Sequence, residues 1–127
     1  MIKGFIGNCK DFINIKNNRG ETVLHVASMI SNNFLHHPGE DLEIVQLLLK
    51  NEVNVTAITS SNNESAFHYS ACSGNVSILE EIVANTNSGL LILVVNKQNR
   101  LGWTPLLTAC SMGHLEVARK LLESHAR

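Results

Sequence analysis

The residues that could do chemistry in this chain of 127 residues include six histidines, three cysteines and an adjacent pair of glutamates. His36 and His37 are neighbours followed by Pro-Gly, whereas a zinc site needs four ligands, which are usually paired at short spacing. Glu80 and Glu81 would point about 100° apart on a helix, so they cannot work as a carboxylate pair. The eight glycines are scattered and form no phosphate-binding loop. The sequence therefore offers no positive feature for an enzyme, and we expect neither a metal nor a cofactor.

The cysteines Cys9, Cys72 and Cys110 are odd in number and contain no CxxC pair. A secreted domain of this size usually carries a denser, even set. We therefore expect free, buried thiols in a reducing compartment. Cys110 in particular is expected to be a packing residue and not a nucleophile.

Charge and hydropathy exclude two further classes of partner. The formal net charge is −1, whereas nucleic-acid binders usually carry a basic excess that neutralises phosphates. The N-terminus lacks the unbroken apolar stretch of a signal peptide. The most apolar run, residues 90–95, is six residues long, far below the roughly 18–20 that cross a bilayer. We expect a globular, cytoplasmic chain that binds no nucleic acid and does not insert directly into a membrane.

Three segments with one residue pattern recur along the chain, at residues 20–28, 63–71 and 102–110. Each is followed by an apolar pattern of helical period, at residues 42–49, 76–83 and 115–122. The repetition predicts paired antiparallel helices and no extended sheet. The expected helices cover residues 23–30, 41–50, 66–73, 76–84, 105–112 and 115–124.

The residues that flank the first helix of each pair support this assignment. Thr22, Ser65 and Thr104 can cap that helix with a hydroxyl. Pro105 follows in the first helical position, where its missing N–H has no cost. Gly74 and Gly113 can end the helix in a left-handed conformation.

These segments resemble the ankyrin repeat, whose signature is G-x-T-P-L-H-x-A-A followed by G-H-x-E-I-V-x-L-L-L. The third copy, residues 102–123, matches almost throughout. The resemblance implies an all-α solenoid of stacked antiparallel helix pairs with finger loops and irregular inserts between repeats. It divides the chain into the tail of a preceding repeat (1–16), a repeat with a long insert between its helices (17–59), a degenerate repeat with a loop insert (60–98) and a repeat truncated at its C-terminus (99–127). Both ends suggest a piece of a longer array.

The inserts follow from the spacing of the capping residues. Thr22, Ser65 and Thr104 are 43 and 39 residues apart, 10 and 6 more than the 33 of an ankyrin repeat. In the first repeat most of the excess falls around residues 31–39, whose Asn, Pro and Gly favour a loop. In the second repeat it falls between Val83 and Val95, where we also expect a loop.

Residues 17–127 are also similar to the ankyrin region of no-mechanoreceptor-potential-C (TRPN-type) mechanosensitive channels. The similarity lies in residues 19–30, 40–49, 66–69 and 102–107 and in the irregular inserts. It implies a cytosolic segment of a tetrameric cation channel, which acts as a tether or gating spring with microtubules as a partner. This chain has no pore of its own to conduct ions. The alternative is a stand-alone ankyrin adaptor or regulatory protein unrelated to channels.

The family resemblance implies a structural role for two histidines and a binding role for positions that vary between repeats. His25 and His68 hold the T-P-L-H position and are implied to hydrogen-bond between repeats, whereas Leu107 replaces this histidine in the third copy. The implied function is a scaffold that binds other proteins through its concave face and contacts adjacent repeats of the same array. The candidate protein-binding residues are Arg19, Glu21, Asn62, Glu64, Arg100, Leu101, Trp103 and Met112.

The third repeat is the best local candidate for the partner site, because Arg, Trp and Met are enriched in interface cores. Two alternatives stay open. Trp103 can instead stack on a neighbouring finger within the array. Phe34 and Leu35 of the insert can form a second docking loop, or can fold back onto the helices.

Overall fold

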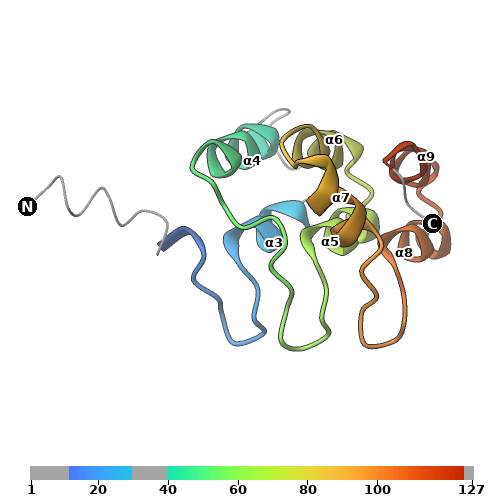
Figure 1. The fold of residues 1–127 in the computed structure, drawn as a ribbon, viewed down its shortest axis with the longest axis horizontal. Coiled ribbons are helices and arrows are strands. Elements are labelled where there is room, and N and C mark those ends of the chain that lie inside the picture. Colours follow the sequence, from blue (N-terminus) through green and yellow to red (C-terminus); the bar gives the residue numbers. More distant parts are fainter. Residues whose placement is uncertain (1–11, 30–39, 125–127) are drawn as a thin grey trace, which may run out of the picture.

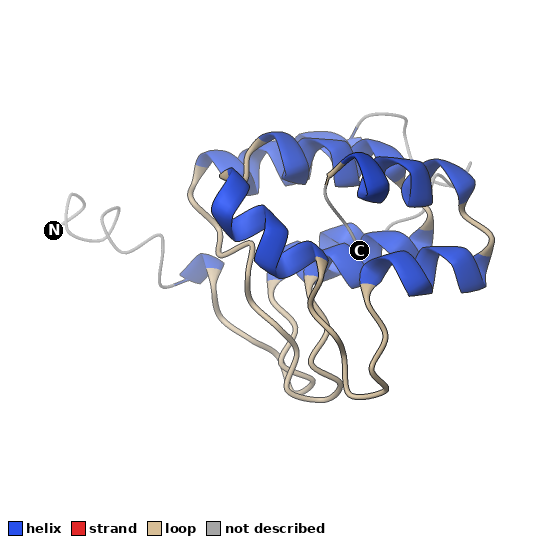
Figure 2. Cartoon of the chain, turned by 45° about the vertical axis from the view of Figure 1, so that its right-hand side comes forward, coloured by secondary structure: helices blue, strands red, loops and turns tan. Residues whose placement is uncertain are grey.

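The computed structural model describes residues 12–29 and 40–124 of the chain (Figure 1). The helices are α3 (Val23–Ser28), α4 (Glu40–Lys50), α5 (Ala66–Ser73), α6 (Val76–Ala84), α7 (Ser88–Val95), α8 (Pro105–Met112) and α9 (Leu115–Glu123). Helices α3, α5 and α8 lie side by side in one layer and α4, α6 and α9 in a second, with finger loops that project from the first layer (Figures 1 and 2). The residues described contain no strand. The predicted all-α solenoid of stacked helix pairs is confirmed.

Each first helix begins at the predicted capping residue. The hydroxyls of Thr22, Ser65 and Thr104 accept from the backbone N–H three residues later, at 3.5, 3.4 and 3.3 Å. Pro105 occupies the first turn of α8. Gly74 and Gly113 end α5 and α8 with φ of +79° and +76°, a conformation that glycine adopts without a Cβ clash. The local signals for these helices are therefore correct.

One side chain at the base of each finger holds that finger closed. Asn17 Oδ1 accepts from the backbone N–H of residues 19 and 21, both at 2.9 Å, and Asn99 Oδ1 accepts from residues 101 and 103 at 2.9 and 3.0 Å. In the middle finger Thr59 Oγ1 takes this place and accepts from residues 62 and 64 at 3.4 and 3.0 Å. These bonds replace the solvation of loop amides, so each finger has a defined shape.

The expected loop between Val83 and Val95 is wrong in the structure, because α7 occupies most of it. Asn87 caps this helix by accepting from the N–H of Leu90 at 2.9 Å. The segment is apolar on every side, so it lacks the alternation of apolar and polar residues that marks a surface helix. Val94 and Val95 are buried, whereas Leu93 is 70% exposed.

The core lies between the two helix layers, and many of its buried residues belong to the central repeat. Its largest fully buried side chains include Phe67 of α5, Ile78, Leu79 and Ile82 of α6, and Leu121 of α9. Helix α5 contacts both α3 and α8, while α6 contacts both α4 and α9. The central helix pair is therefore covered on both sides.

The predicted burial of the thiols is wrong for Cys110, which is exposed, and Cys72 is only partly buried. The residue that matches Cys110 in the central repeat, Ala71, is fully buried. The difference arises because α5 has α8 packed against it, whereas no further helix among the described residues covers that face of α8. Cys9, the insert at residues 31–39 with its Phe34, Leu35, His36 and His37, and residue 30 lie outside the described part of the chain.

Within residues 12–29 and 40–124, none of the helices combines the length and the apolar character needed to cross a membrane.

Candidate functional site: a groove between the fingers and the first helices

Two buried histidines, His25 and His68, form hydrogen bonds between successive repeats. His25 Nε2 lies 2.8 Å from the carbonyl oxygen of Glu64, and His68 Nε2 lies 2.8 Å from that of Trp103. The other ring nitrogen, Nδ1, accepts from the backbone N–H of Thr22 or Ser65 at 3.1 Å. A carbonyl can only accept and an amide N–H can only donate, so both rings are neutral with the proton on Nε2. The predicted inter-repeat role of these histidines is confirmed, and Leu107 at the matching position is exposed.

Burial lowers the pKa of both histidines below the ordinary value of 6.5, although the bonds to the carbonyls of Glu64 and Trp103 oppose the shift. The unfolded chain therefore takes up protons at these positions at a higher pH than the folded chain does. The stability contributed by the neutral rings is complete above the unfolded pKa, and it is lost as the pH falls through that value toward the lower folded pKa. Protonation also places a second proton on Nδ1, opposite the amide N–H that it accepts from.

We expect the denaturant midpoint of this chain to fall when the pH is lowered from 7.5 to 5.5, because that window contains the unfolded histidine pKa. The matched variant is His68→Gln, which cannot titrate and keeps an amide donor for the carbonyl of Trp103. Its midpoint should be lower than that of the parent at pH 7.5 but should depend less on pH. Urea titrations at both pH values measure the effect. A midpoint that is unchanged or higher at pH 5.5 would contradict the assignment of neutral, buried rings.

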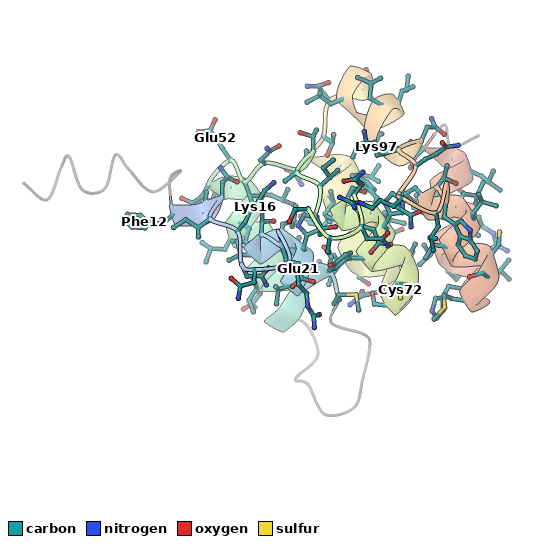
Figure 3. All side chains as sticks on the ribbon, turned by 90° about the horizontal axis from the view of Figure 1, so that it is seen from below. Phe12, Lys16, Glu21, Glu52, Cys72 and Lys97 are labelled. Atoms are coloured by element: carbon teal, nitrogen blue, oxygen red, sulfur yellow. The ribbon has the colours of Figure 1, made fainter. Side chains whose placement is uncertain are left out.

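A groove of about 400 Å³ opens between the fingers and the first helices, on the side where Figure 3 shows Glu21 and Cys72. Glu52 and Lys97 lie toward the opposite side of the molecule in this view. The groove is lined by residues of two fingers and three first helices: Arg19, Glu21, Val26, Met29, Glu64, His68, Tyr69, Cys72 and Thr108. Because the fingers of successive repeats lie side by side and the first helices do the same, residues far apart in sequence meet at one surface (Figure 1).

Hydrogen bonds fix the polar groups of the groove. Glu21 Oε1 accepts from the Asn17 amide at 2.8 Å and Glu21 Oε2 accepts from the Tyr69 hydroxyl. These two bonds lower the pKa of the Glu21 carboxyl, while burial and the Glu21 charge raise the pKa of Tyr69. The Tyr69 ring meets His25 edge to face, with centroids 5.0 Å apart. Glu64 Oε2 accepts from the Asn99 amide at 3.1 Å.

The structure brings three of the predicted binding residues, Arg19, Glu21 and Glu64, together at this groove. Asn62 and Arg100 join neighbouring fingers. The N–H of Arg100 donates to the carbonyl of Asn62 at 3.1 Å, and its guanidinium donates to that of Ser60 at 2.9 Å.

Leu101, Trp103 and Met112 are exposed on the third repeat and do not line the groove. Sequence reasoning missed Val26 and Tyr69. Each directly follows a buried repeat histidine on its helix. Its position in the repeat could therefore have marked it as a residue of the groove.

Among the described residues no group of three or more His, Cys, Asp or Glu side chains is arranged to hold a metal ion. Both ring nitrogens of His68 in the groove are used in backbone bonds, so this histidine is not free to act as a general base. The groove presents two carboxylates, a guanidinium and an apolar floor, which are groups suited to non-covalent contact with another molecule.

The comparisons with known proteins agree with this architecture. The sequence model of ankyrin repeats (three copies) matches residues 1–87 and 37–127. The chain is 30% identical over 89 residues to the ankyrin repeat-containing protein ITN1 of Arabidopsis thaliana, covering 58% of this chain and 15% of the relative. It is 30% identical over 116 residues to the probable 26S proteasome regulatory subunit p28 of Saccharomyces cerevisiae (91% and 44%). It is 32% identical over 114 residues to the poly [ADP-ribose] polymerase tankyrase of Caenorhabditis elegans (84% and 5%).

The chain thus spans less than half the length of each of these three relatives, and none of the three is a TRPN channel. The family assignment depends on the repeats themselves, which the sequence model matches from one end of the chain to the other. The described helix pairs, finger loops and inter-repeat histidine bonds have the form that the repeat pattern predicts. This chain belongs to the ankyrin repeat family.

Proposed function

We propose that this chain is a protein-binding module and that its concave face, made by the fingers and the first helices, receives the partner. The observation that carries the proposal is the groove of about 400 Å³ lined by Arg19, Glu21, Glu64 and Met29, among others. The capping hydroxyls and histidines already hold the backbone beneath it. The side chains of the groove are therefore available for recognition on a scaffold that needs no rearrangement.

The proposed surface extends beyond the groove to the middle finger and across the third repeat. Arg19, Glu21 and Glu64 form its groove part, and Asn62, Arg100, Leu101, Trp103 and Met112 form its extension. Its support is exposure: Leu101, Trp103 and Met112 are large apolar side chains that the fold leaves open. Large apolar groups beside a guanidinium are typical of interface cores. The proposal includes the division of the chain into repeat segments 1–16, 17–59, 60–98 and 99–127. It also includes a cytoplasmic location.

A second candidate is a more specific function, that of a mechanical element in a channel. The resemblance of residues 17–127 to TRPN channels favours a tether or gating spring, with microtubules as partner, in a mechanosensitive channel. A stand-alone adaptor is equally consistent with the ankyrin repeats. The complete transcript separates the channel candidate from the adaptor candidate, because the transcript of a channel subunit encodes six hydrophobic spans and a pore. The proposed function is binding and not catalysis.

We expect Trp103→Ala to weaken partner binding by about thirtyfold, close to 2 kcal/mol, because an aromatic side chain that becomes buried on binding commonly contributes this much. The side chain is 40% exposed in the free chain, so the unfolding free energy should change by less than about 1 kcal/mol. The probe is a peptide selected on this chain from a random library, and fluorescence anisotropy measures its affinity.

The matched control is Leu93→Ala on α7, an exposed apolar residue that does not line the groove. It should leave peptide affinity unchanged. If Trp103→Ala lowers the melting temperature and leaves affinity per folded molecule intact, Trp103 stacks within the array and is not an interface residue.

A further inference from the structure

The two carboxylates of the groove are held in place by neutral groups. Glu21 is bonded by the Asn17 amide and the Tyr69 hydroxyl, and Glu64 by the Asn99 amide. Neutral donors orient a carboxylate without cancelling its charge. Of the described residues, neither glutamate forms an ion pair, and the pair between Arg119 and Glu116 lies on α9. The groove therefore keeps two negative charges in fixed positions.

The positive charge at the groove does not balance them. Arg19 lines the groove and its charge contributes to the lowered pKa of Glu21, but its guanidinium forms no ion pair with Glu21 or Glu64. His68 also lines the groove, and it is neutral because both of its ring nitrogens are committed to backbone groups. With Arg19 counted, the lining carries one net negative charge.

Part of one acidic side chain is open to a ligand. Glu64 Oε2 accepts from Asn99, whereas its Oε1 receives no hydrogen bond from any of the described residues. No buried side-chain oxygen or nitrogen among the described residues lacks a partner, so this oxygen is accessible from outside. A guanidinium or ammonium group can reach it without displacing an existing bond.

The floor beside these charges is apolar. Val26 of α3 and Met29, the residue that follows α3, are exposed and line the same groove, and Cys72 of α5 lies there too. Thioether and aliphatic surfaces of this kind accept apolar side chains of varied shape. The groove thus combines an acidic site with an apolar seat.

We propose that the groove binds an extended segment of a partner protein that places a lysine or arginine side chain at Glu64 and Glu21 and an adjacent apolar side chain against Val26 and Met29. This inference rests on the proposed function of the concave face. It adds the chemistry of the partner: a basic side chain next to an apolar one. The fixed carboxylates select the charge, and the floor supplies contact area.

The test selects peptides on this chain from a random dodecamer library displayed on phage, and then measures the affinities of synthetic copies. The selected peptides should be enriched in Lys or Arg beside an apolar residue. Glu64→Gln should weaken their binding about tenfold, because the isosteric amide removes the charge. Replacing the basic residue of the peptide by citrulline should cost a similar factor. The matched control Glu80→Gln, an exposed carboxylate on α6, should change nothing.

Met29→Lys, which adds a cation and removes the apolar seat, separates failure of this inference from failure of the proposed function. If this variant loses binding while Glu64→Gln and Glu21→Gln do not, the concave face binds protein without the charge selection, and the inference is wrong. If neither Met29→Lys nor the glutamine variants weaken binding, or if no peptide can be selected, both proposals are wrong.

Discussion

Phe67→Ala should cost this chain about 3–5 kcal/mol of unfolding free energy, the usual range for truncating a fully buried phenylalanine. Phe67 is 0% exposed and is the largest fully buried side chain of the described residues. It belongs to α5, which packs against α3 on one side and α8 on the other, so the cavity opens at the centre of the stack. A domain of this size has only about 5–15 kcal/mol in total. Urea denaturation followed by circular dichroism measures the loss.

The third repeat supplies the matched control for this change. Leu106 holds the same repeat position as Phe67 but is only partly buried. Leu106→Ala should therefore cost about half as much or less, because part of its surface already meets water. Equal losses for the two variants would show that the stack is not centred on the middle repeat.

Gly20→Ala should be the second most damaging change, with two causes that can be separated. The φ of Gly20 is +79°, and an L-residue in this conformation costs about 1–2 kcal/mol. A Cβ at this position would also lie 2.3 Å from the backbone nitrogen of Ser60 in the neighbouring finger. Because the obstacle is backbone, the fingers must move apart, and such overpacking commonly costs a further 1–3 kcal/mol, roughly.

Gly102→Ala isolates the first cause. Its φ is +80°, but a Cβ there meets no atom within 4 Å. The difference in unfolding free energy between the two variants therefore measures the close approach of the first two fingers. If the two variants are equally destabilised, finger contact contributes nothing and only backbone strain acts.

The local elements could be predicted from the sequence because their signals are local. Thr22, Ser65 and Thr104 cap helices with their own hydroxyls, and Gly74 and Gly113 adopt the conformation that ends them. These effects involve residues within one turn of each other, so the order of residues is enough to find them. The repeat pattern then gives the order of stacking.

What could not be predicted depends on neighbours. Helix α7 has no amphipathic period, so only packing reveals it as a helix. The exposure of Cys110 follows from what covers α8, not from its position in the repeat. The bond from Tyr69 to Glu21 joins residues 48 apart in sequence, and the groove exists only because the fingers bring them together. Long-range contacts of this kind carry no local signature.

The most direct measurement is hydrogen–deuterium exchange of this chain with and without a peptide selected on it. The concave-face account predicts slower exchange of amides at residues 19–29, 62–73 and 100–112 when the peptide is bound. Exchange in α4 and α6, which form the opposite layer, should be unchanged. Protection confined to α4, α6 or α7, with none in the fingers or first helices, would contradict it.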